Sequence, residues 1–195
     1  MNTLKIIALS TVLFASNLAL ANNDHKIGLE LQGGNATYKS SSQDGDGVSS
    51  VYLYYSYQFD PLYSLEVGFI RGGESENWNC TDINDYKIEC NKEKYAYFGL
   101  GADELNFHNF VVATRMEWDL TTNSHLYAKA GLHHYDYNIQ KNNSNIASEN
   151  GISYLVEGGW EYQWQNGIGA NIALRHVDMG HLDITTWGAG ISYRF

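Results

Sequence analysis

The chain has 195 residues, the size of a single domain, and its formal net charge at pH 7 is −10. This excess of acidic residues argues against nucleic acid or an anionic membrane surface as its partner. The mean hydropathy is −0.37, and no segment after residue 21 approaches the about 20 apolar residues of a transmembrane helix. A membrane protein of this composition must cross the bilayer with strands in which apolar and polar residues alternate.

The first 21 residues are predicted to be a secretory signal peptide. Lys5 is the only charged residue in this stretch, an apolar run follows it, and Ala19-Leu20-Ala21 forms a small-x-small cleavage site. A membrane-anchor helix is the alternative interpretation, but the apolar run is too short and is broken by Ser, Thr and Asn. We therefore expect a mature domain of residues 22–195 with a net charge of −11, because the signal peptide removes one lysine.

Eight later stretches alternate with a period of two, which is the pattern of strands with two different faces. One face is apolar or aromatic, and the other is small, polar or charged. The predicted strands are 26–37, 48–59, 64–71, 106–119, 126–137, 152–164, 168–177 and 185–195.

The connections between these stretches alternate in length. Those at 60–62, 121–124 and 166–167 are tight, whereas 39–47 and 72–105 are long, 140–150 is intermediate and 178–183 is short but polar. Short turns at one end and longer loops at the other are typical of transmembrane barrels. Outward aromatic residues also gather where every second strand ends, and they predict a periplasmic aromatic girdle. Its members are Tyr57, Phe59, Trp118, Tyr162 and Trp164.

These observations predict an all-β fold, an eight-stranded antiparallel up-and-down transmembrane β-barrel with both termini in the periplasm. A soluble sandwich is the alternative, but it has no reason to place aromatic residues at the same end of every second strand. The final strand, with Tyr193 and Phe195, resembles the closing strand of bacterial outer-membrane barrels. That resemblance implies that the two residues form a signal read by the barrel-assembly machinery.

Two motifs resemble the OmpA transmembrane domain family. The first is Tyr55–Phe69, in which Tyr57-Gln58, the Asp60-Pro61 turn and Glu66 match the family's strand–turn–strand. The second is Gly158-Gly159-Trp160-Glu161-Tyr162. The spacing departs from the family at its lumen gate, because Asn171 rather than Arg175 falls opposite Glu161. The peptidoglycan-binding domain of full-length OmpA is not expected here.

Charged residues on the inward face are predicted to form a lumen network. They are Glu30, Glu66, Arg115, Glu117, Lys129, Glu157, Glu161, Arg175 and Arg194. The interior of an eight-stranded barrel is just wide enough for side chains to fill, and buried charges must pair. The network is therefore interpreted as a paired plug, and a narrow gated pore is the alternative.

The segment 74–104 is acidic, with eight acids against three bases. It predicts either a solvated, repulsive cell surface or a face that recruits divalent cations or a basic partner. Cys80 and Cys90 lie in the same segment, and no other cysteine competes with them. Oxidation during export is expected to join them in one disulfide, the alternative being two separate thiols.

No catalytic, cofactor or metal site is predicted. His133 and His134 point to opposite faces of a strand, and Asp44-Gly45-Asp46-Gly47 lacks the later ligands of a calcium loop. Around Arg175-His176 the chain resembles lipid A deacylases, which need a serine nucleophile two residues after the histidine. Asp178 holds that position, so we expect no enzymatic activity.

The predicted function is therefore that of an outer-membrane barrel acting structurally and through its extracellular loops. The roles considered are adhesion, colonisation, and contact with a host or with lipopolysaccharide; a small, mostly closed ion-conducting pore is the alternative. The expected partners are outer-membrane lipid and lipopolysaccharide, the barrel-assembly machinery and a ligand at the loops, and the barrel is expected to be a monomer.

Overall fold

The computed structural model describes residues 24–41, 46–74, 78–84, 87–92, 98, 100, 102 and 104–195. The predicted signal peptide lies outside the described residues. No helix in the described part of the chain is long and apolar enough to cross a membrane.

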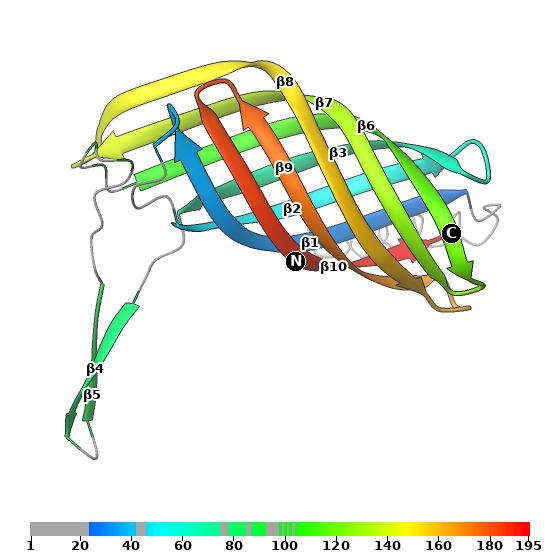
Figure 1. The fold of residues 1–195 in the computed structure, drawn as a ribbon, viewed down its shortest axis with the longest axis horizontal. Helices are drawn as coiled ribbons and strands as arrows, with labels where there is room; N and C mark the ends of the chain where they lie inside the picture. Colours follow the sequence, from blue (N-terminus) through cyan, green and yellow to red (C-terminus); the bar gives the residue numbers. More distant parts are fainter. Residues whose placement is uncertain are drawn as a thin grey trace, which may run out of the picture.

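Eight antiparallel strands close into a barrel in the order β1-β10-β9-β8-β7-β6-β3-β2 (Figure 1). The first and last strands form the seam, from Lys26 opposite Arg194 to Tyr38 opposite Leu182. The predicted fold class is confirmed. The barrel strands are β1 (His25–Tyr38), β2 (Asp46–Gln58), β3 (Tyr63–Glu74), β6 (Glu104–Thr121), β7 (Ser124–Lys141), β8 (Ser144–Gln163), β9 (Ile168–Met179) and β10 (Leu182–Arg194).

The two ends of the barrel differ. The end with the β2–β3, β6–β7 and β8–β9 connections and the C-terminus is named the turn end here. The opposite end, with the connections after β1, β3, β7 and β9, is named the loop end. A separate two-stranded hairpin, β4 (Trp78–Asn84) and β5 (Lys87–Lys92), follows β3. Figure 1 shows this hairpin standing off from the barrel at the loop end.

The predicted loop at 140–150 is wrong. The β7 strand continues to Lys141, β8 begins at Ser144, and only Asn142 and Asn143 form the turn between them, both with positive φ. The predicted connection at 178–183 likewise shrinks to Gly180 and His181. The ends of these strands lie beyond the apolar belt, where the polarity of the two faces is reversed: the outward residues are mostly polar, and apolar residues such as Tyr137, Ile139 and Met179 are buried on the inward face.

Alternation within the strands separates lipid-facing and inward residues. The outward apolar residues form an exposed band, named the apolar belt here, because every barrel strand carries large apolar residues among its outward positions. On the loop-end side it is bounded by Leu31, Val51, Phe69, Phe110, Leu132, Ile152, Leu174 and Trp187. Intervening residues are buried, as with Tyr52 and Tyr54 between exposed Val51, Leu53 and Tyr55. The predicted inward and outward faces of β2 are thus those of the structure.

Candidate functional site

The lumen near the turn end holds a group of five charged residues, named the turn-end cluster here: Lys26, Arg115, Glu117, Glu161 and Arg194. Lys26 Nζ lies 2.9 Å from Glu117 Oε1 and 3.0 Å from Glu161 Oε1. Arg115 contacts the same two carboxylates at 2.8 and 2.6 Å, and Arg194 reaches Glu117 at 3.2 Å. Two carboxylates are therefore shared by three cations.

A second group lies next to it toward the loop end and is named the central cluster: Glu30, Glu66, Lys129, Glu157 and Arg175. Lys129 Nζ contacts Glu66 at 2.6 Å and Glu157 at 2.9 Å. Arg175 Nη2 lies 2.5 Å from Glu30 and also pairs with Glu157. The Tyr52 hydroxyl donates to Glu66 at 2.6 Å. Here two cations are shared by three carboxylates, so the excess charges of the two clusters have opposite signs.

Uncharged side chains connect the two clusters. The Asn171 amide donates to Glu30 at 2.8 Å and to the Tyr127 hydroxyl at 3.1 Å. The Arg115 guanidinium lies over the Tyr127 ring, 3.7 Å from its centroid, a cation–π contact. Together the ten charges cancel, which limits the desolvation cost of burying them.

Glycines opposite the lumen tyrosines give these rings room. Gly28 lies directly across from Tyr54, and a Cβ on Gly28 would come within 2.3 Å of Tyr54 Cζ. Gly159 lies across from Tyr127 in the same way, with 2.5 Å to Cζ. Inward glycine therefore lets a large ring lie flat against the opposite strand.

The loop-end part of the lumen is apolar, which the sequence analysis did not predict. Buried aromatic and aliphatic side chains from most barrel strands pack together there, each no more than 8% exposed. We name this group the apolar plug; it includes Tyr38, Val48, Leu105, Phe107, Tyr137, Ile139, Met179, Leu182 and Ile184. Side chains thus fill the lumen from the loop end down to the central cluster.

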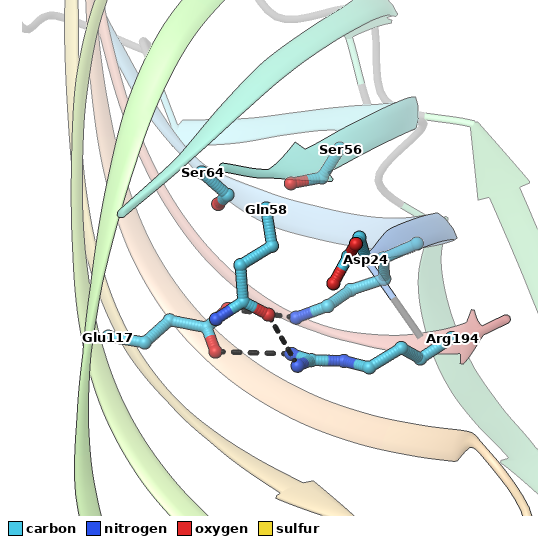
Figure 2. Close-up of a pocket in the computed structure, with 7 residues that line it drawn as sticks. Asp24, Ser56, Gln58, Ser64, Glu117 and Arg194 are labelled. Atoms are coloured by element: carbon cyan, nitrogen blue, oxygen red, sulfur yellow. Dashed lines mark hydrogen bonds and ion pairs between the residues drawn. The ribbon is translucent and has the colours of Figure 1, made fainter. Parts of the chain in front are cut away.

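At the turn end the lumen narrows to a cavity of about 10 Å³, which is the size of one water molecule. Figure 2 shows Glu117 and Arg194 meeting across it, with Gln58 accepting a hydrogen bond from Arg194 at 2.8 Å. The remaining lining residues are Asp24, Lys26, Ser56 and Ser64.

All nine charged residues of the predicted network lie on the inward face, and eight of them are buried; Arg194 is partly exposed at the turn end. The sequence analysis missed Lys26, although this residue has the same inward parity as Glu30, which lies four residues further along β1. The register places Glu161 opposite Asn171 and Glu157 opposite Arg175, which agrees with the departure from the family gate. Glu161 pairs with Lys26 and Arg115 instead.

The predicted girdle and assembly residues lie around the turn end. Tyr57, Phe59, Trp118, Trp164 and Tyr193 are exposed on the outer surface, and Tyr162 and Phe195 are half-buried. Phe195 exchanges backbone hydrogen bonds with His25, and their rings stack with centroids 5.8 Å apart. The last residue is thereby attached to the first strand.

Cys80 and Cys90 lie directly opposite each other in the β4–β5 hairpin. Opposed residues of antiparallel strands have Cα atoms about 4.5–5.5 Å apart, within the range that a disulfide spans. The register is therefore compatible with the predicted bond.

Among the described residues, no group of three or more His, Cys, Asp or Glu side chains is arranged to hold a metal ion. Asp178, which stands where a deacylase would carry its serine, accepts a hydrogen bond from Ser153. His176 contacts the Thr185 hydroxyl at 3.0 Å. A nucleophile–base pair of the deacylase kind is not formed by these side chains.

The family model of the outer membrane protein β-barrel domain matches residues 6–195. No curated protein matches the sequence. Among solved structures, neisserial surface protein A is similar with a TM-score of 0.62 at 12% identity, over 88% of this chain and 97% of that chain.

The attachment invasion locus protein Ail of Yersinia pestis has a TM-score of 0.56 at 13% identity, over 88% of this chain and 97% of its own. OprG from Pseudomonas aeruginosa has a TM-score of 0.55 at 11% identity, over 88% and 95%. At these identities the likeness concerns the fold alone.

Proposed function

Since the chain belongs to the outer membrane protein β-barrel family and is an outer-membrane protein, we propose that it is a closed barrel that acts through its loop end. It serves as a rigid, non-conducting base from which the loop-end segments contact other molecules outside the cell. Both termini lie in the periplasm after export, and the barrel is a monomer.

The observation that carries this proposal is the filled lumen. The apolar plug at the loop end is buried, and so are the two ion-pair clusters below it, apart from Arg194, which is partly exposed at the turn end. An ion moving through would have to displace packed rings such as Phe107 and Tyr137 and then break pairs such as Lys129–Glu157. Buried pairs are costly to break, because removal of one partner strands the other charge.

The loop end supplies the contact surface. The β7 and β8 strands extend past the apolar belt as a continuous hairpin, and the β4–β5 hairpin lies in the segment that carries the acidic excess (Figure 1). A structure of Ail is a complex with the heparin analogue sucrose octasulfate. A polyanion of that kind would be repelled by eight acids against three bases in residues 74–104. A basic protein surface is therefore the better partner for this chain.

Cell binding tests the contact role. Cells expressing the intact barrel are compared with cells expressing a barrel in which residues 75–103 are replaced by a short Gly-Ser linker, with equal surface levels verified. We expect the intact barrel to increase adhesion to a surface coated with a basic protein, and the trimmed barrel to lose most of that increase. Equal adhesion by both would contradict the assignment to this segment.

Planar-bilayer recording of the purified mature protein tests closure. We expect no steady single-channel steps. If steps occur and Glu66→Gln or Arg175→Gln changes their size, the protein is instead a narrow pore.

Mass spectrometry of lipid A from cells with and without the protein tests whether the protein adds or removes acyl chains of lipid A. We expect no difference, and a changed acylation pattern would contradict the proposal.

A further inference from the structure

The wall of the barrel has an open strand edge at the loop end. The β8 strand pairs with β7 as far as Ser144 opposite Lys141, but with β9 only as far as Leu155 opposite Val177. Figure 1 shows the β7–β8 hairpin reaching past the β9–β10 turn. Over residues 144–154 the side of β8 turned away from β7 therefore pairs with no strand of the described chain. We name this side the β8 edge.

The backbone groups of alternate residues point toward the β8 edge, because successive residues of a strand turn their N–H and C=O groups to opposite sides. Gln163 donates to Asn123 on the β7 side, and Trp164 donates to Ile168 on the β9 side. The register of β8 with β7 continues without a shift as far as Ala147, so the even-numbered residues face the edge. Those without a backbone partner there, in the part of the chain that the structure describes, include Ser148, Asn150 and Ile152.

Side chains hold the point at which β8 and β9 separate. His133 Nε2 lies 3.2 Å from Tyr154 O and 2.8 Å from Asp178 O, and Ser153 Oγ donates to the Asp178 carboxylate. The backbone carbonyls that lose their strand partners are thus supplied with another one. The separation is therefore a built feature of the barrel wall.

The β8 edge carries none of the usual protection against pairing. Edge strands are commonly protected by lysine, proline or a bulge. Residues 147–154 contain neither lysine nor proline, and the register shift of β8 comes nearer the hairpin tip. The only charged residue of this stretch is Glu149, whose carboxylate is bound by Tyr137 and His181. The edge is thus left open to an incoming strand.

The β8 edge lies outside the hydrocarbon. Ile152 marks the loop-end boundary of the apolar belt, and Ser148 and Asn150 lie beyond it on the same strand. Unpaired backbone groups are not tolerated where lipid surrounds them. Water is what these groups meet, and a polypeptide with free backbone groups of its own can replace that water.

We propose that the β8 edge binds an extended, basic segment of another protein by strand addition. Backbone hydrogen bonds would supply the affinity, as in other cases of strand addition. Charge would select a basic segment, because Asp178 and Asp183 lie opposite each other at the end of the β9–β10 hairpin, beside the separation. A lysine or arginine in the added strand would pair with them. The position of this edge outside the cell rests on the proposed function.

A second copy of the chain is the weaker occupant. Two barrels in one membrane share its orientation, so their β8 strands would have to meet as parallel strands. Parallel pairing is the less stable arrangement. It would also bring Asp178 and Asp183 of both copies to the same end, where their charges repel.

Hydrogen exchange followed by NMR tests the site directly, with a short synthetic peptide of alternating lysine and threonine added to the folded mature protein. The amides of Ser148, Asn150 and Ile152 should become protected when the peptide binds. Those of Glu149 and Gly151 face β7 and should be protected with or without it. Binding without this alternating gain of protection would overturn strand addition at the β8 edge.

Asn150→Pro removes an N–H group from the β8 edge and leaves the ladder with β7 intact, which is where proline is tolerated in a sheet. The affinity for the peptide should fall about tenfold, which corresponds to about 1.4 kcal/mol. Asn150→Ala is the matched control, because it removes the side chain and keeps the N–H group, and it should bind as the wild type does. Heat-modifiable migration in SDS verifies folding. Equal affinity of the proline variant and the wild type would overturn the site.

Three comparisons decide the occupant. The barrel with residues 75–103 replaced by a Gly-Ser linker should bind the peptide as the intact barrel does, and loss of binding would place the peptide on the acidic segment instead. A peptide of alternating glutamate and threonine should bind more weakly, and equal binding would overturn the preference for a basic segment. A wild-type dimer that Asn150→Pro abolishes would overturn the partner protein in favour of a second copy.

The proposed function and the β8 edge can fail separately. Cell adhesion that depends on residues 75–103 tests the proposed function, whereas peptide binding that depends on the Asn150 N–H group tests the edge. Adhesion lost on trimming together with unchanged peptide binding by Asn150→Pro would overturn the edge alone.

Discussion

Glu161 lies opposite Asn171 across β8 and β9, and Arg175 lies opposite Glu157 four residues further toward the loop end. The lumen arginine of β9 therefore belongs to the central cluster, where it meets Glu30 and Glu157. Glu161 is bound by Lys26 and Arg115 in the turn-end cluster. This offset separates the buried charges into two groups.

Arg175→Met should destabilise the barrel. The substitution leaves Glu30 and Glu157 buried with Lys129 as the remaining cation of the central cluster, and removal of one partner of a buried pair costs about 3–5 kcal/mol. Urea unfolding in lipid vesicles, followed by tryptophan fluorescence, measures the loss. Arg175→Met/Glu30→Gln should recover part of it, since one stranded charge is neutralised. An unchanged unfolding midpoint in Arg175→Met would show that the pairs contribute nothing.

Gly28→Ala should destabilise the barrel by about 1–3 kcal/mol through overpacking. The new methyl group would lie 2.3 Å from Tyr54 Cζ, and the Tyr54 ring is buried beside Tyr52. Gly158→Ala is the matched control, because it has no close neighbour. In a double-mutant cycle with Tyr54→Leu, the cost of Gly28→Ala should shrink. Purely additive effects would disprove the steric account.

Phe195→Ala should lower the amount of protein in the outer membrane while leaving export across the inner membrane intact. The side chain is a proposed assembly signal, and it also stacks on His25 at the seam. Phe59→Ala is the control, because Phe59 is an exposed aromatic residue of the same end that lies away from the seam. Fractionation and heat-modifiable migration measure the outcome, and wild-type levels of Phe195→Ala protein would refute the signal.

Cys80 and Cys90 should form a single intramolecular disulfide. Chain entropy suggests a local stabilisation of roughly 2–3 kcal/mol for so short a loop. Titration of thiols in non-reduced, denatured protein should find none, and two free thiols would refute the bond. Cys80→Ser/Cys90→Ser protein should still insert and resist SDS, with proteolysis increasing only in residues 75–103. Failure of this variant to insert would mean that the bond does more than hold the hairpin.

Acidification should loosen the loop-end part of β8. Burial alone would raise the pKa of Glu149, but hydrogen bonds from His181 and Tyr137 outweigh burial and hold the pKa below 4.5. A carboxylate with a depressed pKa contributes its stabilisation above its unfolded pKa and loses it as the pH falls through the folded pKa. The attachment of β8 to the β9–β10 turn should therefore weaken as the pH falls below about 4.5.

A spin label at Asn145 would report this change as increased mobility on lowering the pH from about 6 to about 3. Glu149→Gln should be mobile at both values, since it cannot form the charged contact. Identical mobility of the wild-type label at the two pH values would exclude Glu149 as the attachment point.

The period-two alternation was sufficient to predict the eight barrel strands and their inward faces, because the belt imposes an apolar outward residue at each second position. It failed beyond the belt, because the residues of 140–150 are mostly polar and their two apolar members, Ile146 and Ala147, are adjacent and do not alternate. The sequence analysis did not predict the apolar layer above the charges, to which Phe107 belongs. The alternation also cannot predict the ion pairs themselves. Lys26, for example, pairs with Glu117 and Glu161, which come from strands that are distant in the sequence.

The seam between β1 and β10 joins the first strand of the domain to the last, from Lys26 opposite Arg194 onward. This is the most non-local pairing in the barrel, so its loop-closure entropy is the largest that the chain must overcome. Until β10 is in place, β1 and β9 both present unpaired edges, which are sites of aggregation. An incomplete barrel therefore exposes two strand edges, and the chain must be kept from pairing with other chains until the β1–β10 seam has closed.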